Sequence, residues 1–368
     1  MKKLAFIYDA IYPYQMGGVE KRIYSISQLL KKKYSVHLVG MKSWEGDNTL
    51  HKDGIYYHGI FQKMPMYKKN GVRRIDETLI YSYRLVKFLL KNNFDIIDCQ
   101  ATTSFPVFAV YLVNKLKRNQ KIFITYHEYW EKDYWIMYMG KIKGTLGYII
   151  QKITLYLSKN IIAVSEDTKN RIKKYTKNKI YIIPNGIDQK EINKIKKEKK
   201  EYDLVYAGRL HDFKNVDKII KAVKVNPKLN VVIIGTGPEL ENLKKMSKGL
   251  KIKFTGFLKD QIDVYKYISK SKIFMMLSER EGFSIVTLEA LALGVPVICY
   301  NNKNNPAKYL IQNYKNGILI KSMKINIIYK AINTIESKYK NYSYNAQTSV
   351  KEYYLENIIK SLLNTYEN

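Results

Sequence analysis

The chain has 368 residues, which is long for one hydrophobic core and comfortable for two domains. It carries 64 Lys and Arg against 32 Asp and Glu, a formal net charge of +32, which predicts partners that bear phosphate: nucleotides, nucleic acid or an anionic membrane. Only two cysteines occur, and no uninterrupted apolar run reaches roughly 18 residues, so composition excludes a disulfide framework and predicts no membrane-spanning helix.

The first half of the chain alternates short apolar runs with stretches of helical spacing. Leu4–Tyr8 is the first run, and Gly17 and Gly18 separate it from a predicted helix between Val19 and Leu30. A Gly-Gly turn there lets backbone approach an anionic ligand, although an ordinary turn is the alternative. Further strands are predicted at 36–39, 55–58, 95–99, 122–126, 161–165 and 180–183. Near-continuous β-branched runs separated by helices predict a parallel sheet covered on both faces.

His127 directly follows the predicted strand 122–126. Ligands of parallel α/β sheets bind at the carboxyl ends of the strands, so this histidine is the candidate functional one among the five in the chain. The alternative is a histidine that only hydrogen-bonds neighbouring backbone.

Two aromatic and basic stretches predict a membrane-binding or acceptor-binding surface. Residues 62–74 (QKMPMYKKNGVRR) and 129–148 combine cations with Met, Tyr and Trp. Rings settle at headgroup depth and cations attract anionic lipid, whereas the alternative is a buried aromatic helix beside a solvated basic loop. The candidate residues are Lys68, Lys69, Arg73, Arg74, Trp130 and Trp135.

The second half repeats the alternation, with strands predicted at 202–207, 231–234, 252–254, 273–277 and 297–299. The octapeptide 208–215 (GRLHDFKN) follows the first of these strands. Arg209 offers a rigid fork of donors and Lys214 a mobile point charge, which together suit a diphosphate leaving group.

Segment 278–296 (SEREGFSIVTLEALALGVP) guides our interpretation of the second half of the chain. Glu281 lies in the loop before a predicted helix, and Glu289, eight residues later, lies inside it. Ser284 is the predicted N-cap, and Gly294 ends the helix. Carboxylates can accept from paired sugar hydroxyls, and open amides at the helix start suit a phosphate. A helix whose acids face water is the alternative.

Taken together, the segments resemble the E-x7-E signature of retaining glycosyltransferases of the GT-B fold, family 4 type (group 1). The resemblance extends to Pro-Asn-Gly-Ile-Asp at 184–188, Gly-Arg-Leu…Lys at 208–214 and Gly-Thr-Gly-Pro at 235–238. It implies an α/β fold with two Rossmann-like doubly wound lobes, an inter-lobe cleft and a C-terminal helix that returns to the first lobe. The implied parts are an acceptor-binding lobe (1–188), a nucleotide-sugar-binding lobe (189–345) and the helix (346–368). That helix is predicted to bury Val350, Tyr354, Ile358, Leu362 and Tyr366 on one face.

The resemblance also implies roles for individual residues. The implied catalytic residues are His127, Arg209, Lys214 and Glu281. Glu281 would hold hydroxyls of the donor sugar, and Glu289 would hold the ribose. The implied donor-binding residues are Gly17, Gly18, Gly235, Gly237, Gly256, Phe257, Leu258, Gly282, Phe283, Ser284, Ile285 and Glu289.

The expected function is therefore a retaining transfer from a UDP- or GDP-linked sugar to a hydroxyl acceptor, lipid-linked or glycan, in cell-surface glycan assembly. No D-x-D triplet occurs, so we expect no metal and no cofactor beyond the nucleotide-sugar co-substrate. The charge and the absence of a signal-peptide pattern predict a cytoplasmic protein bound to the inner face of the membrane. Sugar-nucleotide epimerisation, phosphorolysis and a non-catalytic nucleotide-binding subunit stay open, and a nucleic-acid partner is not expected because no recognition motif occurs. The sequence predicts no oligomeric state.

Overall fold

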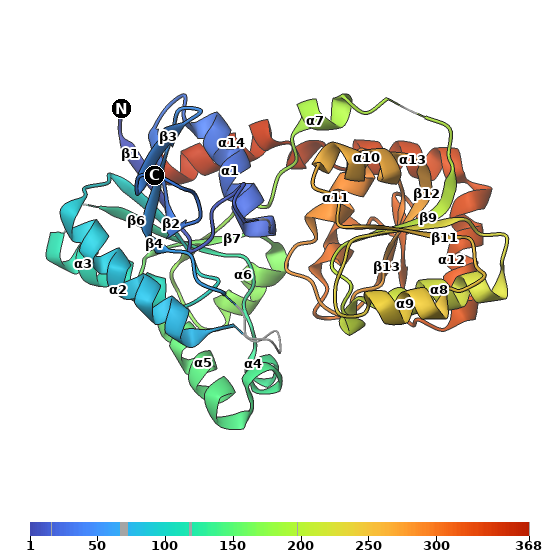
Figure 1. Ribbon diagram of the computed structural model, residues 1–368, viewed down its shortest axis with the longest axis horizontal. Coiled ribbons are helices and arrows are strands. Elements are labelled where there is room, and N and C mark those ends of the chain that lie inside the picture. Colours follow the sequence, from blue (N-terminus) through green and yellow to red (C-terminus); the bar gives the residue numbers. More distant parts are fainter. Residues whose placement is uncertain (16, 67–72, 118–119, 197, 368) are drawn as a thin grey trace. The chain divides into compact units, whose positions relative to one another are not determined.

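Two sheets organise the chain (Figure 1). The computed structural model describes residues 1–15, 17–66, 73–117, 120–196 and 198–367. The chain divides into two compact units: the first is Met1–Asn185 with the C-terminal segment from Leu355 onward, and the second is Gly186–Tyr354. Among the described residues, no helix combines the length and apolar character that a bilayer crossing requires.

The described part of the first unit forms an eight-stranded sheet in the order β3-β4-β2-β1-β5-β6-β7-β8. Every neighbouring pair is parallel except β3 and β4. The strands are β1 (Lys3–Ile7), β2 (Ser35–Lys42), β3 (Thr49–Lys52), β4 (Ile55–Gln62), β5 (Ile96–Gln100), β6 (Lys121–Tyr126), β7 (Asn160–Ala163) and β8 (Lys179–Ile182).

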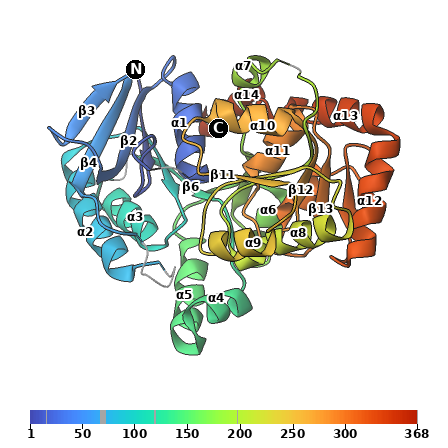
Figure 2. The ribbon, with the colours of Figure 1, turned by 45° about the vertical axis from the view of Figure 1, so that its right-hand side comes forward.

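Helices cover both faces of this sheet, as the continuous apolar strands predict. One face packs on α2 and α3, and the other packs on α1 and α14 (Figures 1 and 2). The helices are α1 (Gly18–Leu30), α2 (Ile75–Lys91), α3 (Phe105–Lys117), α4 (Lys132–Met139), α5 (Lys141–Thr154), α6 (Glu166–Lys173) and α14 (Leu355–Glu367).

The antiparallel strand β3 was not predicted, although its signal is present in the sequence. Lys52 pairs with Ile55, so only Asp53 and Gly54 form the hairpin loop. Both have positive φ, 53° and 75°. Asp-Gly is a preferred dipeptide for a two-residue hairpin turn with positive φ at both positions.

The second unit has a six-stranded, all-parallel sheet in the order β11-β10-β9-β12-β13-β14. The strands are β9 (Tyr202–Ala207), β10 (Val231–Ile234), β11 (Ile252–Gly256), β12 (Ser271–Met276), β13 (Val297–Tyr300) and β14 (Gly317–Ile320), of which β14 was not predicted. One face packs on α8, α9 and α12, and the other carries α10 and α11 (Figure 1). Helix α13 contacts both α11 and α12, and its Tyr342 belongs to the core of the first face. The helices are α7 (Gln189–Asn193), α8 (Val216–Val225), α9 (Leu240–Met246), α10 (Gln261–Ser269), α11 (Ile285–Ala292), α12 (Ile325–Ser337) and α13 (Tyr339–Thr348).

The C-terminal helix α14 returns to the first unit, as expected, but it is shorter than predicted. It begins at Leu355, so Val350 and Tyr354 do not belong to it. Tyr354 is extended (φ −67°, ψ 140°) and bridges to Ile187, which prevents one continuous helix. The predicted apolar spacing holds from Ile358 onward, where the helix packs into the core beside α1.

Candidate active site

The second sheet reverses its strand order between β9 and β12. Strand β9 continues to β10 on one side, whereas β12 and β13 extend the sheet on the other side. This is the doubly wound order in which ligands bind outside the carboxyl ends of the strands at the reversal. Loop 208–215 follows β9 and loop 277–284 follows β12, so the two loops lie at that position.

Lys214 and Glu281 meet across these two loops. Lys214 Nζ lies 2.6 Å from Glu281 Oε1, and the side chains are 15% and 14% exposed. Ser278 Oγ donates to the same carboxylate oxygen at 2.8 Å, and the Glu281 amide donates to the carbonyl of Asn304 at 3.1 Å. Glu281 is therefore held both through its carboxylate and through its backbone amide. Burial and the charge of Glu281 raise the pKa of the Cys299 thiol, which therefore stays protonated.

Hydrogen bonds to backbone carbonyls join the two loops. Asn215 has φ 55°, and its side-chain amide donates to the carbonyl of Leu277 at 3.2 Å. The Glu279 amide donates to the carbonyl of Phe213 at 2.9 Å. Asn is one of the few residues that tolerate left-handed backbone, so it ends the 3-10 turn and starts α8 without strain. These bonds set the distance between Lys214 and Glu281.

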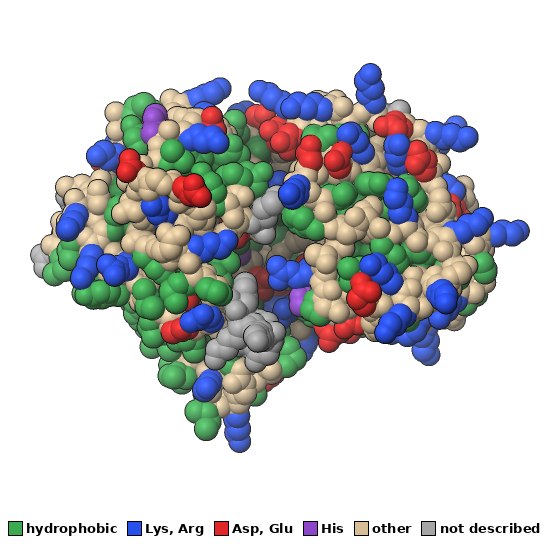
Figure 3. Space-filling view, viewed as in Figure 1, with side chains coloured by type: hydrophobic (Ala, Val, Ile, Leu, Met, Phe, Trp, Pro, Cys, Tyr) green, Lys and Arg blue, Asp and Glu red, His purple; other side chains and the backbone are tan. Residues whose placement is uncertain are grey.

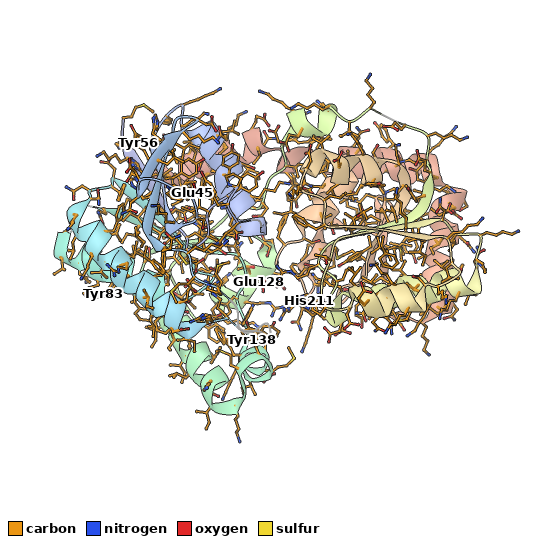
Figure 4. The ribbon with its side chains drawn as sticks, in the orientation of Figure 1. Glu45, Tyr56, Tyr83, Glu128, Tyr138 and His211 are labelled. Atoms are coloured by element: carbon orange, nitrogen blue, oxygen red, sulfur yellow. The ribbon has the colours of Figure 1, made fainter. Side chains whose placement is uncertain are left out.

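Arg209 is exposed at the end of β9, and two glycines support the loop that carries it. A Cβ at Gly235 would lie 2.0 Å from the carbonyl oxygen of Gly208, and its φ is +129°. A Cβ at Gly237 would lie 2.3 Å from the carbonyl oxygen of Leu210. The structure thus gives both glycines a packing role: the loop after β10 presses on the backbone beside Arg209. Burial, and secondarily the charge of Arg209, lower the pKa of His211, two residues further along the loop (Figure 4).

Glu289 lies in α11, where it is buried, with an exposed fraction of 3%. Tyr265 donates its hydroxyl to Oε1 at 3.0 Å, and Gln261 donates its side-chain amide to Oε2 at 3.2 Å. Burial and the charge of Glu289 raise the pKa of Tyr265. Sequence analysis missed Tyr265 and Gln261 as partners, because only the fold brings α10 beside α11.

Helix α11 begins as predicted, but Ser284 does not cap it in the expected way. Ser284 has φ 64°, and its hydroxyl bonds the hydroxyl of Thr287 at 2.8 Å instead of a backbone amide. Among the described residues, the amides from Gly282 to Val286 have no hydrogen-bond acceptor. Open amides at a helix start can receive an anion.

The end of β11 and the loop after it contain three further predicted donor-binding residues, Gly256, Phe257 and Leu258. Gly256 has φ +71°, which favours glycine, and open space surrounds its Cα. Phe257 is 57% exposed, and Leu258 is half-buried. The loop therefore offers an exposed ring and accessible backbone at the outer strand of the sheet.

In the first unit, His127 follows β6 and is buried. Its Nε2 lies 2.8 Å from Oε1 of Gln100, which ends β5. Burial, and secondarily the charge of Arg22, lower the pKa of His127 well below its usual value, so the ring is neutral. Gly17 precedes α1 in extended backbone (φ −157°), and a Cβ there would lie 2.5 Å from Oε2 of Glu20.

Of the residues predicted to contact a membrane or an acceptor, Lys68 and Lys69 lie outside the described residues. Arg73 faces inward and pairs with the buried carboxylates of Asp9 and Glu77. Burial, with the charge of Asp9, raises the pKa of Glu77 to about 7. Arg74 pairs with Asp76.

Trp130 and Trp135 are half-buried in an aromatic cluster with Tyr134 and Tyr138. Tyr138 and the nearby Glu128 are labelled in Figure 4. The indole of Trp130 donates to Glu128 at 2.7 Å. The structure thus places both rings against protein groups.

Two groups of predicted residues emerge. Arg209, Lys214, Glu281 and the start of α11 lie at the carboxyl edge of the second sheet. His127 and the Gly-Gly turn lie at the carboxyl edge of the first sheet. Among the described residues, no cluster of three or more His, Cys, Asp or Glu side chains is arranged to bind a metal.

Two family models match the chain. The model described as "Glycosyltransferase Family 4" matches residues 16–191, and the model described as "Glycosyl transferases group 1" matches residues 187–350. The chain is 25% identical to the O-antigen biosynthesis glycosyltransferase WbnH of Escherichia coli over 97% of both chains. An uncharacterised glycosyltransferase of Haemophilus influenzae is 28% identical over 215 residues, which span 57% of this chain and 60% of that protein.

Solved structures with the same fold cover the whole chain. Sucrose-phosphate synthase from Thermosynechococcus elongatus has a TM-score of 0.81 at 16% identity, covering 100% of this chain and 98% of that one. Anabaena Alr3699/HepE, in complex with UDP and glucose, has a TM-score of 0.74 at 16% identity and full coverage of both chains. These similarities establish the two-lobed, Rossmann-like GT-B fold. The chain belongs to the family 4, group 1 glycosyltransferases.

Proposed function

We propose that this glycosyltransferase moves a sugar from a nucleoside diphosphate to an acceptor hydroxyl with retention of the anomeric configuration and without a metal. The Lys214–Glu281 pair carries the proposal. An ammonium group has three donors, so one hydrogen bond to Glu281 leaves two for a phosphate oxygen. Arg209 is exposed on the same loop and adds a second cation.

The proposed reaction forms one bond and breaks one bond at the anomeric carbon. The bond to the phosphate oxygen breaks, the acceptor oxygen attacks from the same face, and its proton passes to the departing diphosphate. Lys214, Arg209 and the open amides of α11 stabilise the negative charge that develops on the diphosphate. Glu281 accepts hydrogen bonds from hydroxyls of the sugar, and Glu289 accepts hydrogen bonds from hydroxyls of the ribose. No protein nucleophile is required.

We expect a UDP-sugar to stabilise the protein more than GDP- or ADP-sugars do. The support is the fold shared with HepE, which was crystallised with UDP and glucose. A ligand present at 100-fold its Kd adds about 2.7 kcal/mol to the free energy of unfolding. A thermal-shift panel of UDP-, GDP- and ADP-sugars measures this effect, and NMR of the sugar released by slow hydrolysis reports the anomer. Absence of a shift with every nucleotide sugar, or release of the inverted anomer, would contradict the proposal.

The proposed acceptor is a lipid-linked or glycan hydroxyl in cell-surface glycan assembly, reached from the cytoplasmic face of the membrane. The similarity to an O-antigen glycosyltransferase supports this acceptor class. Helix α5 supports membrane binding. Along its outer side, Ile142, Leu146, Ile149 and Ile153 are 85%, 57%, 47% and 43% exposed. No acidic residue occurs in the helix.

This stripe has what an interfacial helix needs. Its apolar residues recur at helical spacing, and Lys141, Lys143 and Lys152 supply cations for anionic headgroups. Tyr83 on α2 adds an exposed ring (Figure 4). In Figure 3, apolar side chains gather over α2 and at the tip formed by α4 and α5, and Lys and Arg side chains lie at the borders of this apolar surface. The proposed surface is thus α5, with the side of α2, instead of Trp130 and Trp135.

We expect the double variant Leu146→Gln/Ile149→Gln to weaken binding to phosphatidylglycerol vesicles at least about tenfold, because two partly buried apolar side chains are worth more than 1.4 kcal/mol at the interface. Vesicle sedimentation at low salt measures the loss. Val225→Gln, which removes a 66% exposed apolar side chain from the second unit, is the matched control and should bind normally. Equal binding by the double variant and the wild type would exclude α5 as the docking surface.

A further inference from the structure

A chain of buried hydrogen bonds leads from the C-terminal helix to His127. Asp98 in β5 is its centre: Oδ2 accepts from the hydroxyl of Tyr366 in α14, and Oδ1 accepts from Thr125 at 2.6 Å. Gln100 donates its side-chain amide to the same Oδ1 at 2.7 Å, and its carbonyl end meets His127. All five side chains are buried, and their exposed fractions do not exceed 8%.

The orientation of the Gln100 amide is determined by its neighbours. Nε2 of Gln100 lies 2.7 Å from Asp98 Oδ1 and 3.3 Å from the Asp98 backbone carbonyl oxygen. A backbone carbonyl can only accept, so the NH₂ group must face Asp98 whatever the protonation state of the carboxyl. Flipping the amide would put Oε1 against two acceptors. Oε1 therefore faces His127.

We propose that Gln100, held by Asp98, is a positioning residue that keeps the proton of neutral His127 on Nε2 and leaves the lone pair on Nδ1. Nε2 of His127 lies 2.8 Å from Oε1 of Gln100. An amide oxygen can only accept a hydrogen bond, so Nε2 of His127 must donate. A neutral imidazole has one N–H, so Nδ1 is an acceptor. Among the described residues, Nδ1 has no hydrogen-bond partner.

The proposal specifies which chemical group His127 can contact. An acceptor nitrogen binds a hydroxyl that donates, and it repels a phosphate oxygen or a carbonyl. His127 therefore recognises a sugar or acceptor hydroxyl and does not serve as an acid toward the leaving group. Arg22, which donates to the carbonyl of Ile183 at 3.1 Å, places a buried positive charge nearby that opposes a second proton on the ring. This role rests on the proposed function.

The direct test is the nitrogen NMR spectrum of the full-length protein labelled with 15N-histidine. Five histidines give a resolvable set, and His127→Asn assigns the signal of interest. We expect a protonated, pyrrole-type Nε2 and a pyridine-type Nδ1 in the wild type. A pyridine-type Nε2 would overturn the proposal, and this readout does not depend on any catalytic activity.

Variants then test the role of Gln100. Gln100→Met removes the hydrogen bonds to Asp98 and to His127, and Gln100→Asn keeps an amide near Asp98 but is too short to reach His127. We expect His127 to populate both neutral tautomers in each variant, and kcat/KM for UDP release from UDP-glucose to fall about tenfold. UDP affinity should not change, because the residues proposed to bind the nucleotide belong to the second unit. If either folded variant kept the wild-type NMR pattern and kcat/KM, the proposal would be wrong.

Gln120→Met is the matched control. Gln120 is also a buried glutamine of the first unit, with no side-chain hydrogen-bond partner among the described residues, so the same substitution should leave the His127 signals and kcat/KM unchanged. Failure of the wild type itself to turn over any UDP-sugar would count against the proposed function, whereas the tautomer assignment would stand on the NMR result alone.

Discussion

Lys214→Met is expected to lower the turnover of UDP-glucose about 10²–10³-fold while the protein stays folded, because it removes one preorganised cation from the departing diphosphate. Lys214 makes a single ion pair, to Glu281 at 2.6 Å, in the part of the chain that the structure describes. Methionine keeps the apolar stem of the side chain and removes only the charge. Steady-state kinetics measures the loss, and circular dichroism verifies the fold.

Lys221→Met provides the matched control. Lys221 also pairs with one carboxylate, Asp217 at 2.9 Å, but its side chain is 47% exposed and lies on α8. That variant should retain wild-type turnover. Glu281→Gln should lower turnover by a similar factor, and the double variant should lose less than the product of the two losses, because the partners act as a unit. Near-normal turnover in either single variant would remove the pair from the mechanism.

The second large effect is expected from Glu289→Ala. The substitution leaves the Tyr265 hydroxyl and the Gln261 amide without their acceptor, so the free energy of unfolding of the second unit should fall by about 2 kcal/mol or more. UDP-sugar affinity should fall at least about tenfold, because the variant lacks the carboxylate that accepts hydrogen bonds from the two ribose hydroxyls. Denaturant unfolding and titration calorimetry measure the two effects separately.

Tyr265→Phe separates the structural part of this effect from the binding part. It removes the 3.0 Å hydrogen bond and keeps the carboxylate. We expect it to destabilise the unit by about 1 kcal/mol while UDP-sugar affinity changes less than threefold. If Glu289→Ala bound UDP-sugar like the wild type, Glu289 would be a structural residue only.

Most strands were predictable because they are buried on both faces. Strands β9 and β10 begin and end at the predicted residues, since four or five apolar residues between polar loops leave little alternative. The errors have local causes. Strand β3 has only one half-buried residue, so its sequence resembles a loop, and α14 begins at Leu355 instead of residue 346 because the turn 351–353 interrupts the apolar spacing.

The amino-acid sequence shows which loops carry charge and glycine, because each of these loops directly follows a strand and that order is local information. Which side chains meet depends on the folded arrangement of the strands and helices. Lys214 and Glu281 are 67 residues apart, and Tyr366 and Asp98 are 268 apart, yet each pair is in hydrogen-bond contact. Such a contact requires two atoms within roughly 3 Å, and it depends on strand order, helix packing and loop backbone together. A periodic pattern defines an element and its buried face, but it does not specify the neighbour across the sheet.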